Sequence, residues 1–287
     1  MQLIIQNLSK TYPNGTKALS DINLEIPTGL FGLLGPNGAG KSSLMRTIAT
    51  LQDADCGSIF LDNLDVMKNK DEMRKYLGYL PQEFGVYPSI SAEELLEHLC
   101  VLKGISNSKQ RKELVRALLN QTNLYEVRKK NVGGYSGGMK QRFGIAQALI
   151  GNPKVIIVDE PTAGLDPAER NRFLNLLSEI SEQVIIIFST HIVEDVKELC
   201  TNMAIINKGQ VVAKGHPQDL INELSGRVFK KVIEKHELDH YKNNFRVISN
   251  KLSAGKTEIH VSSNTQLSID FEPAIAGLED VYFDKII

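Results

Sequence analysis

The most informative segment of the chain is Gly35-Pro36-Asn37-Gly38-Ala39-Gly40-Lys41-Ser42, which fits the pattern GxxxxGK[ST] at every fixed position. It follows the apolar segment 30–34 and precedes a helical pattern at about 41–51, the context that this pattern requires. Glycines let backbone N–H groups turn toward phosphates, and the helix start adds unpaired donors and a positive dipole end. The segment therefore predicts a phosphate-binding loop; the alternative is a glycine-rich turn between a strand and a helix.

Four side chains in or near this loop supply the chemistry of a nucleotide site. Lys41 places a charge beside the β- and γ-phosphates, and the Ser42 hydroxyl can ligate Mg²⁺. The apolar segment Val155-Ile156-Ile157-Val158-Asp159 ends in the carboxylate expected beside such a loop, and Asp159 would hold Mg²⁺ through water. Glu160 comes next and can accept a proton from an attacking water. Without the phosphate loop, this acidic pair would indicate only a solvated strand end.

A third segment is more selective, because many unrelated ATPases share the first two. Tyr135-Ser136-Gly137-Gly138-Met139-Lys140-Gln141-Arg142 resembles LSGGQ, the signature motif of ABC ATPases, with Tyr in place of Leu and a different tail. It precedes the strand that ends at Asp159 and is followed by a helical pattern, as in that family. A Ser-Gly-Gly at a helix start is itself an anion site, although alone it would indicate only a helix cap after a flexible turn.

Shorter segments agree with this resemblance. Gln82, in Leu80-Pro81-Gln82, resembles the Q-loop glutamine of the family, and Gly164-Leu165-Asp166-Pro167 resembles the D-loop. Ser189-Thr190-His191 follows an apolar strand, as the H-loop does, and Tyr12 lies where the family stacks an aromatic ring on adenine. Ser43 replaces a frequent threonine and keeps the hydroxyl.

The resemblance implies a complete ATPase site. The residues expected to bind ATP are Tyr12, Gly35, Pro36, Asn37, Gly38, Ala39, Gly40, Lys41, Ser42, Ser43, Ser136, Gly137, Gly138 and Asp166. Those expected to hold Mg²⁺ are Ser42, Gln82 and Asp159. Those expected to act in catalysis are Glu160, which polarises water, His191, which contacts the γ-phosphate, and Gln82.

The resemblance also implies the fold and the domains. The fold class is α/β: a RecA-like P-loop NTPase core with an antiparallel β subdomain and a helical subdomain, plus a small C-terminal α+β appendage. The ABC cassette is expected over residues 1–218, with the helical subdomain at about 88–150. Strand-like segments at 228–233, 245–249 and 257–261 lie among polar linkers, and they predict the accessory domain at 219–287.

Composition limits the other classes of function. The chain has 287 residues with a net charge of −1, so no basic field indicates a nucleic-acid partner. The three cysteines are far apart and form no metal spacing, which favours reduced thiols in a cytosolic protein. No apolar run approaches the roughly 18 residues that cross a bilayer, so a membrane-spanning part would be another chain.

These features predict an ATP-hydrolysing subunit that works in pairs. The chain has one phosphate loop and one signature, and the resemblance to ABC ATPases implies that two cassettes, identical or homologous, enclose two ATP molecules. It also implies that they drive a separate transmembrane permease from the cytoplasmic face of the membrane. Residues 278–283, Leu-Glu-Asp-Val-Tyr-Phe, resemble the close of subunits that serve ABC-2 type exporters, or are an ordinary amphipathic end. The alternatives are an importer subunit and, further away, a soluble ABC ATPase acting on ribosomes or DNA.

Overall fold

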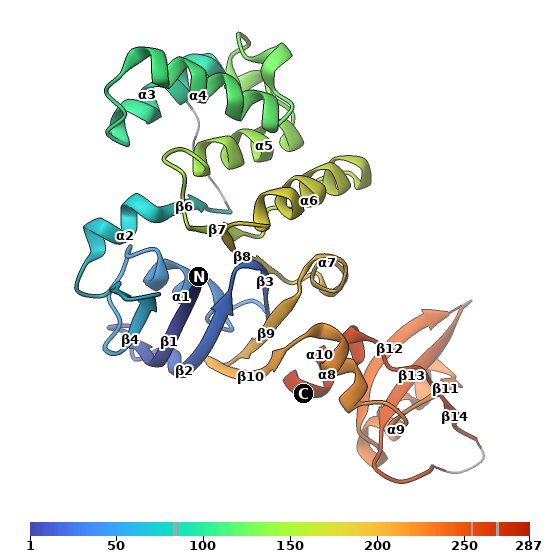
Figure 1. Ribbon diagram of the computed structural model, residues 1–287. Helices are drawn as coiled ribbons and strands as arrows, with labels where there is room; N and C mark the ends of the chain where they lie inside the picture. Colours follow the sequence, from blue (N-terminus) through green and yellow to red (C-terminus); the bar gives the residue numbers. More distant parts are fainter. Residues whose placement is uncertain (83–84, 86, 254, 268–269) are drawn as a thin grey trace.

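A six-stranded sheet lies at the centre of the computed structural model, which describes residues 1–82, 85, 87–253, 255–267 and 270–287 (Figure 1). Five strands run parallel in the order β9-β3-β8-β7-β6, and β10 pairs antiparallel with β9 at one edge. The strands are β3 (Gly29–Leu34), β6 (Leu77–Leu80), β7 (Val155–Asp159), β8 (Ile185–Thr190), β9 (Asn202–Asn207) and β10 (Gln210–Gly215). Every residue of β7 and β8 is buried, as expected for continuous apolar runs in a parallel sheet covered on both faces.

Alternate residues of each central strand point to opposite faces of the sheet and belong to two separate apolar clusters. On one face, Ile157 and Ile187 pack with α1 (Lys41–Ile48), α2 (Lys70–Tyr76) and the antiparallel sheet. On the other face, Ile156 and Phe188 pack with α6 (Pro167–Ser181), α7 (Val193–Leu199) and α8 (Pro217–Glu223). Helices on both faces of a mainly parallel sheet form the RecA-like P-loop core that the sequence predicted.

The other two parts of the predicted core also form. An antiparallel sheet in the order β2-β1-β4-β5 is built from β1 (Gln2–Thr11), β2 (Lys17–Pro27), β4 (Cys56–Leu61) and β5 (Leu64–Asp65). The helical part, at the top of Figure 1, comprises α3 (Ala92–Leu102), α4 (Ser108–Gln121), the 3₁₀ turns Tyr125–Val127 and Val132–Gly134, and α5 (Gly137–Ala148). It has an apolar cluster of its own, centred on buried residues such as Leu96, Leu119 and Phe143.

The C-terminal part is a third sheet, in the order β12-β13-β11-β14. Its elements are β11 (Val228–Ile233), a 3₁₀ turn (Lys235–Glu237), α9 (Leu238–Asn244), β12 (Val247–Ser253), β13 (Lys256–Ser262), β14 (Glu272–Pro273) and α10 (Leu278–Ile286). One face of the sheet packs against α9 in a small aromatic-rich cluster around Phe229, Ile259 and Phe271. This arrangement is the small α+β appendage that the sequence predicted.

The last helix, α10, joins the appendage to the core. Its buried Leu278 and Val281 belong to the same apolar cluster as Val196 of α7, Met203 of β9 and Leu220 of α8. α10 also packs against β12 of the C-terminal sheet. The helix therefore lies between the two parts, as Figure 1 shows near the C-terminus.

A half-buried ion pair ties α10 to the C-terminal sheet. His260 Nδ1 of β13 lies 2.7 Å from Asp280 Oδ1, and Gly277 N–H donates to the other oxygen of Asp280 at 2.8 Å. The hydrogen bond to Asp280 raises the pKa of His260 above its ordinary value of 6.5. Burial alone would raise the pKa of Asp280, but the hydrogen bonds from His260 and Gly277 outweigh burial and lower it.

This pair makes the stability of the chain depend on pH. The stabilisation from His260 is complete below about pH 6.5 and is lost as the pH rises through its raised folded pKa. The stabilisation from Asp280 is present above about pH 4 and is lost as the pH falls through its lowered folded pKa. We predict that His260→Gln lowers the free energy of unfolding by about 1.5–3 kcal/mol at pH 5.5, and by less at pH 9. Urea titrations at both pH values measure this, with Lys251→Gln, at the exposed pair with Glu279, as the control. An equal loss at both pH values would contradict the prediction.

Candidate functional site

The phosphate loop is held so tightly that only glycine fits at two of its positions. A Cβ at Gly35 would lie 2.3 Å from the carbonyl oxygen of Ile206 in β9, and one at Gly40 would lie 2.4 Å from that of Ala18 in β2. Gly40 also has φ of 111°, a left-handed value that favours glycine. The backbones of β9 and β2 therefore pack directly against the loop and fix its conformation at the start of α1.

Lys41 lies over this loop rather than in solvent. Its Nζ donates to the carbonyl oxygens of Gly35 at 2.6 Å and Pro36 at 3.2 Å, and it lies 4.0 Å from Glu160 Oε1. Burial lowers the pKa of Lys41, although the charges of Glu160 and Asp159 act against this. The ammonium of Lys41 is thus a buried positive charge at the centre of the loop, and water would screen its attraction for a bound anion only weakly.

Asp159 ends β7 beside the loop, with 7% of its surface exposed. The Ser189 hydroxyl donates to its Oδ1 at 2.9 Å, and β7 and β8 pair with Asp159 opposite Ser189. Burial raises the pKa of Asp159, opposed by the hydroxyls of Ser189 and Ser42 and by the charge of Lys41. A buried carboxylate beside a serine hydroxyl is a set of oxygen donors that suits Mg²⁺.

The carboxylate of Glu160 is in contact with two other residues that were predicted to act in catalysis, Gln82 and His191. Gln82 Nε2 lies 3.4 Å from its Oε2, and His191 Nδ1 lies 3.3 Å from the same oxygen. The backbone of Glu160 has φ of 46°, a left-handed value that costs a residue with a side chain about 1–2 kcal/mol. Its N–H donates to the Ser189 carbonyl at 3.0 Å, so β8 helps to hold this conformation.

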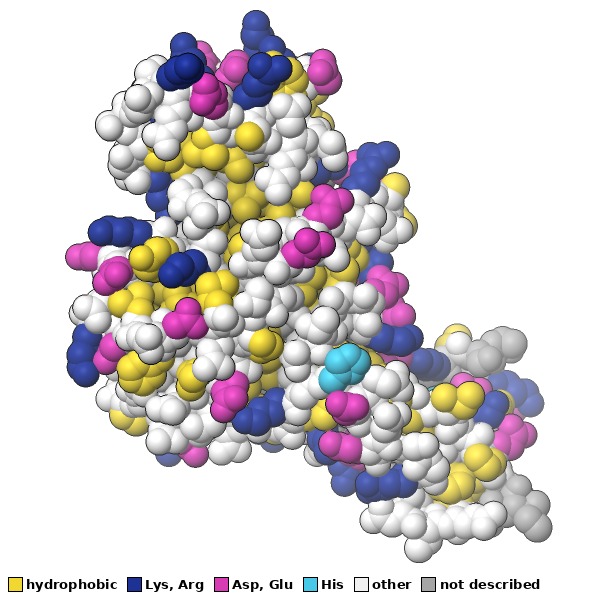
Figure 2. All heavy atoms as spheres, in the orientation of Figure 1, with side chains coloured by type: hydrophobic (Ala, Val, Ile, Leu, Met, Phe, Trp, Pro, Cys, Tyr) yellow, Lys and Arg dark blue, Asp and Glu magenta, His cyan; other side chains and the backbone are white. Residues whose placement is uncertain are grey.

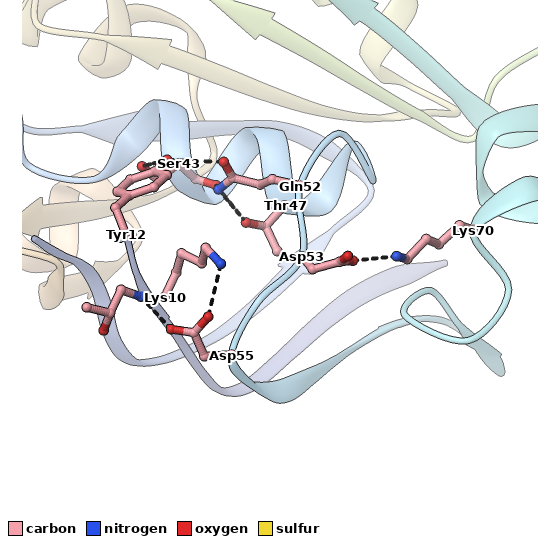
Figure 3. Close-up of polar contacts among 9 residues, drawn as sticks. Lys10, Tyr12, Ser43, Thr47, Gln52, Asp53, Asp55 and Lys70 are labelled. Atoms are coloured by element: carbon pink, nitrogen blue, oxygen red, sulfur yellow. Dashed lines mark hydrogen bonds and ion pairs between the residues drawn. The ribbon is translucent and has the colours of Figure 1, made fainter. Parts of the chain in front are cut away.

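A cavity of about 560 Å³ connects Lys41, Gln82 and Glu160 to Tyr12. It is lined by Tyr12, Thr16, Lys17, Ala18, Pro36, Asn37, Gly38, Ala39, Gly40, Lys41, Ser42, Ser43, Gln82, Glu160 and Lys208. The Tyr12 hydroxyl lies 3.0 Å from Ser43 Oγ and donates to Gln52 Oε1 at 3.1 Å (Figure 3). Gln52 in turn donates to the Ser43 carbonyl and the Thr47 hydroxyl of α1, at 2.8 and 2.9 Å. The ring of Tyr12 is therefore fixed relative to the phosphate loop.

The predicted signature and D-loop residues lie elsewhere. Ser136 caps α5, and its hydroxyl accepts from Met139 N–H at 3.3 Å. Asp166 caps α6 in the same way, accepting from Glu169 N–H at 2.9 Å. Arg142 of α5 and Glu169 of α6 form an ion pair between the two helices. Neither these residues nor Gly137 and Gly138 are among those that line the cavity.

Two residues of this network were not singled out from the sequence as contacts of the site. In the sequence, Ser189 is part of the segment Ser189-Thr190-His191 and has no separate predicted role. The apolar runs 155–158 and 184–188 could have indicated Ser189, because parallel strands end at the same edge of a sheet. The polar residues that follow the two runs, Asp159 and Ser189, are therefore expected side by side. No local pattern marks Gln52, whose bond with Tyr12 depends on how the segment after β1 lies beside α1.

Comparisons with known proteins agree with the fold and the motifs. The family model described as "ABC transporter" matches residues 19–163. The chain is 34% identical to the uncharacterized ABC transporter ATP-binding protein YxlF of Bacillus subtilis, over 99% of both chains. It is also 34% identical to the linearmycin resistance ATP-binding protein LnrL of the same organism, over 77% of this chain and 71% of that protein.

A solved structure described as a dimeric post-hydrolysis state of the ATP-binding cassette MJ0796 bound to ADP and Pi is 27% identical to this chain. Its TM-score is 0.67, and the match covers 75% of this chain and 98% of that one. The chain therefore belongs to the ABC transporter ATP-binding proteins. It is an ATPase of this family, and ATP is its nucleotide.

Lys41 is predicted to be indispensable for nucleotide binding. Lys41→Ala should raise the Kd for ATP on the order of a hundredfold, because it removes the buried charge at the centre of the loop. Isothermal titration calorimetry on the folded variant measures this. Lys208→Ala changes an exposed ammonium at the rim of the same cavity and should have a smaller effect. Equal affinities of Lys41→Ala and the unaltered chain would remove Lys41 from this role.

The Tyr12 network separates the role of the ring from that of the hydroxyl. Tyr12→Ala should weaken ATP binding about tenfold, since stacking of an aromatic ring on a base contributes roughly 1–3 kcal/mol. Tyr12→Phe keeps the ring but loses the bonds to Ser43 and Gln52, so it should weaken binding less. The same titration compares the two variants, and an alanine variant that binds as tightly as the phenylalanine variant would show that no base stacks there.

Proposed function

We propose that this chain is the ATP-hydrolysing subunit of an ABC exporter, that two cassettes close around two ATP molecules, and that they drive a separate transmembrane permease. One observation carries the proposal. The phosphate loop, Gln82 and Glu160 line one cavity, and His191 contacts Glu160, whereas the signature segment lies outside the cavity, with Ser136 and Gly137 exposed. The exposed start of α5, which Ser136 caps, is the kind of helix N-terminus that binds anions, and it lies apart from the phosphate loop of its own chain. A second cassette would bring each signature to the other chain's ATP.

Within such a composite site, the groups divide the work. Lys41 would hold the β- and γ-phosphates, and Tyr12 the adenine. Glu160 would take a proton from the attacking water, and His191 and Gln82 would orient the reacting groups around it. The phosphate-loop residues 35–43, with Ser136, Gly137, Gly138 and Asp166 of the partner cassette, would complete the ATP site.

The oxygen donors at the loop support a metal ion as well. Ser42, Asp159 and Gln82 would hold Mg²⁺. Mg²⁺ would neutralise negative charge on the phosphates. Burial raises the pKa of Asp159, and a nearby cation would oppose this by favouring the charged form of the carboxylate.

An apolar hollow of about 350 Å³ between the core and the helical part supports a permease partner. Among its lining residues, Leu51 is 55% exposed and Leu102 is 71% exposed. Figure 2 shows hydrophobic side chains gathered between the helical part at the top and the sheets below it. We propose that an apolar segment of the permease docks here. We place the subunit on the cytoplasmic face of the membrane through this partner. No helix in the described part of the chain has the length and apolarity to cross a membrane.

The direction of transport is proposed from relatives and from the last helix. One relative is the linearmycin resistance ATP-binding protein LnrL. Another is the probable multidrug ABC transporter ATP-binding protein YbhF of Escherichia coli, at 34% identity over 79% of this chain and 39% of that protein. The segment 278–283, which resembles the close of exporter subunits, forms most of α10. We further propose that the cassette ends near residue 218, within α8, and that 219–287 form the accessory domain.

The paired arrangement predicts a trapped dimer. Glu160→Gln keeps the size and hydrogen bonding of the side chain but cannot take a proton, so hydrolysis should fall by about 10²–10⁴, while Lys41, Ser42 and Asp159 still bind ATP. ATP should then hold two chains together, and the variant should run as a dimer in size-exclusion chromatography with ATP and Mg²⁺.

A second substitution tests whether the signature completes the site. Ser136→Arg, added to Glu160→Gln, should abolish the dimer, because the bulky side chain would block the partner's phosphate site. The matched control is Ser108→Arg, which makes the same change at the exposed start of α4 and should leave the dimer intact. Wild-type hydrolysis by Glu160→Gln would exclude Glu160 as the base, and a dimer indifferent to ATP and to Ser136→Arg would exclude the composite site.

A further inference from the structure

A fully buried carboxylate lies behind the catalytic cluster. Asp195, in the first turn of α7, has 0% of its surface exposed. The Thr162 hydroxyl donates to its Oδ2 at 2.7 Å, and Arg170 Nε donates to its Oδ1 at 2.7 Å. The Thr190 hydroxyl lies 3.5 Å from Oδ2. A buried charge is costly unless several donors satisfy it, and here the donors come from three different segments.

Each of these donors is close in sequence to a residue with a proposed role in hydrolysis. Thr162 follows Glu160 by two residues. Thr190 directly precedes His191, and its hydroxyl also accepts the Ile192 N–H at 2.9 Å. Arg170 lies in the first turn of α6, the helix that Asp166 caps. One carboxylate therefore connects the segment after β7, the end of β8 and the start of α6.

The backbone of Glu160 shows why such a connection is needed. Its left-handed φ of 46° is a conformation that persists only where the surroundings enforce it. On one side of the residue, its own N–H is held by the Ser189 carbonyl at 3.0 Å. On the other side, the nearest side-chain anchor is the bond from Thr162 to Asp195. The side chain of His191 is half exposed, so packing alone does not fix it.

We propose that Asp195 is a positioning residue for hydrolysis: through Thr162 and Thr190 it holds Glu160 and His191 at the distance and orientation that the reaction requires. The inference rests on the proposed roles of these two residues. Asp195 does not line the nucleotide cavity, so it acts through Glu160 and His191 and touches no substrate itself. Loss of the contact from Thr162 should let Glu160 relax, and a misplacement of about 1 Å can cost on the order of a hundredfold in rate.

The experiment uses two substitutions at Thr162, which is 4% exposed. Thr162→Val keeps the shape of the side chain and removes the hydroxyl, whereas Thr162→Ser keeps the hydroxyl. We expect Thr162→Val to lower kcat about ten- to hundredfold and to leave the Kd for ATP within about twofold, because Lys41 and Tyr12 hold the nucleotide from other elements. Thr162→Ser should retain most of kcat. Asp195→Asn should resemble Thr162→Val.

A matched control separates positioning from stability. Asp280→Asn weakens the ion pair between the buried Asp280 and His260 in the appendage, and it should lower the thermal midpoint without lowering kcat. Two outcomes would overturn the proposal: unchanged kcat in Thr162→Val, or losses of kcat that follow the thermal midpoint equally in Thr162→Val, Thr162→Ser and Asp280→Asn. Failure of the proposed function looks different, because Glu160→Gln would then hydrolyse ATP at the rate of the unaltered chain.

Discussion

The nucleotide site depends on the parallel register of β3, β7 and β8. Leu34 pairs with Thr190, and Asp159 pairs with Ser189, so the three strands end together at one edge of the sheet. A phosphate loop, an acidic pair and a histidine that are far apart in the sequence are thereby placed within a few ångströms of each other. A shift of this register by one residue would turn Asp159 to the other face of the sheet, so the apolar residues that fix the register also fix the chemistry.

The first turn of α6 links the nucleotide site at the ends of these strands to the neighbouring helices α5 and α7. Glu169 pairs with Arg142 of the signature helix, and the adjacent Arg170 pairs with Asp195 of α7. The carboxylate of Glu169 also fills the space where a Cβ at Gly138 would lie. The signature helix, the D-loop and the segment around His191 are thus fastened to one short stretch of backbone. The segments that face the two proposed ATP sites of a dimer are therefore mechanically joined in each chain.

Much of this architecture could be predicted from the sequence, because its strongest signals are local. Apolar runs marked β7 and β8, and the glycine-rich loop between a strand and a helix indicated a P-loop core. Ser91 with Glu94 forms the capping box that starts α3, which the spacing of a serine and a glutamate indicates by itself. The contacts of Asp195 and His260, and the bond from Tyr12 to Gln52, could not be predicted, because each joins segments whose proximity only the tertiary fold creates. The same holds for α10, whose apolar pattern does not say which surface it covers.

The position of α10 has a consequence for how the protein is made. Leu278, Val281 and Tyr282 complete an apolar cluster that also contains residues of β3, β7 and β8. During synthesis from the N-terminus, those strands leave the ribosome long before residue 282 does, and domains otherwise fold as they emerge. Until then, Val196, Met203 and Leu220 lack the helix that covers them. The nascent chain therefore exposes an apolar surface until α10 has been synthesised. A chaperone that recognises apolar segments would bind this surface on each newly made chain.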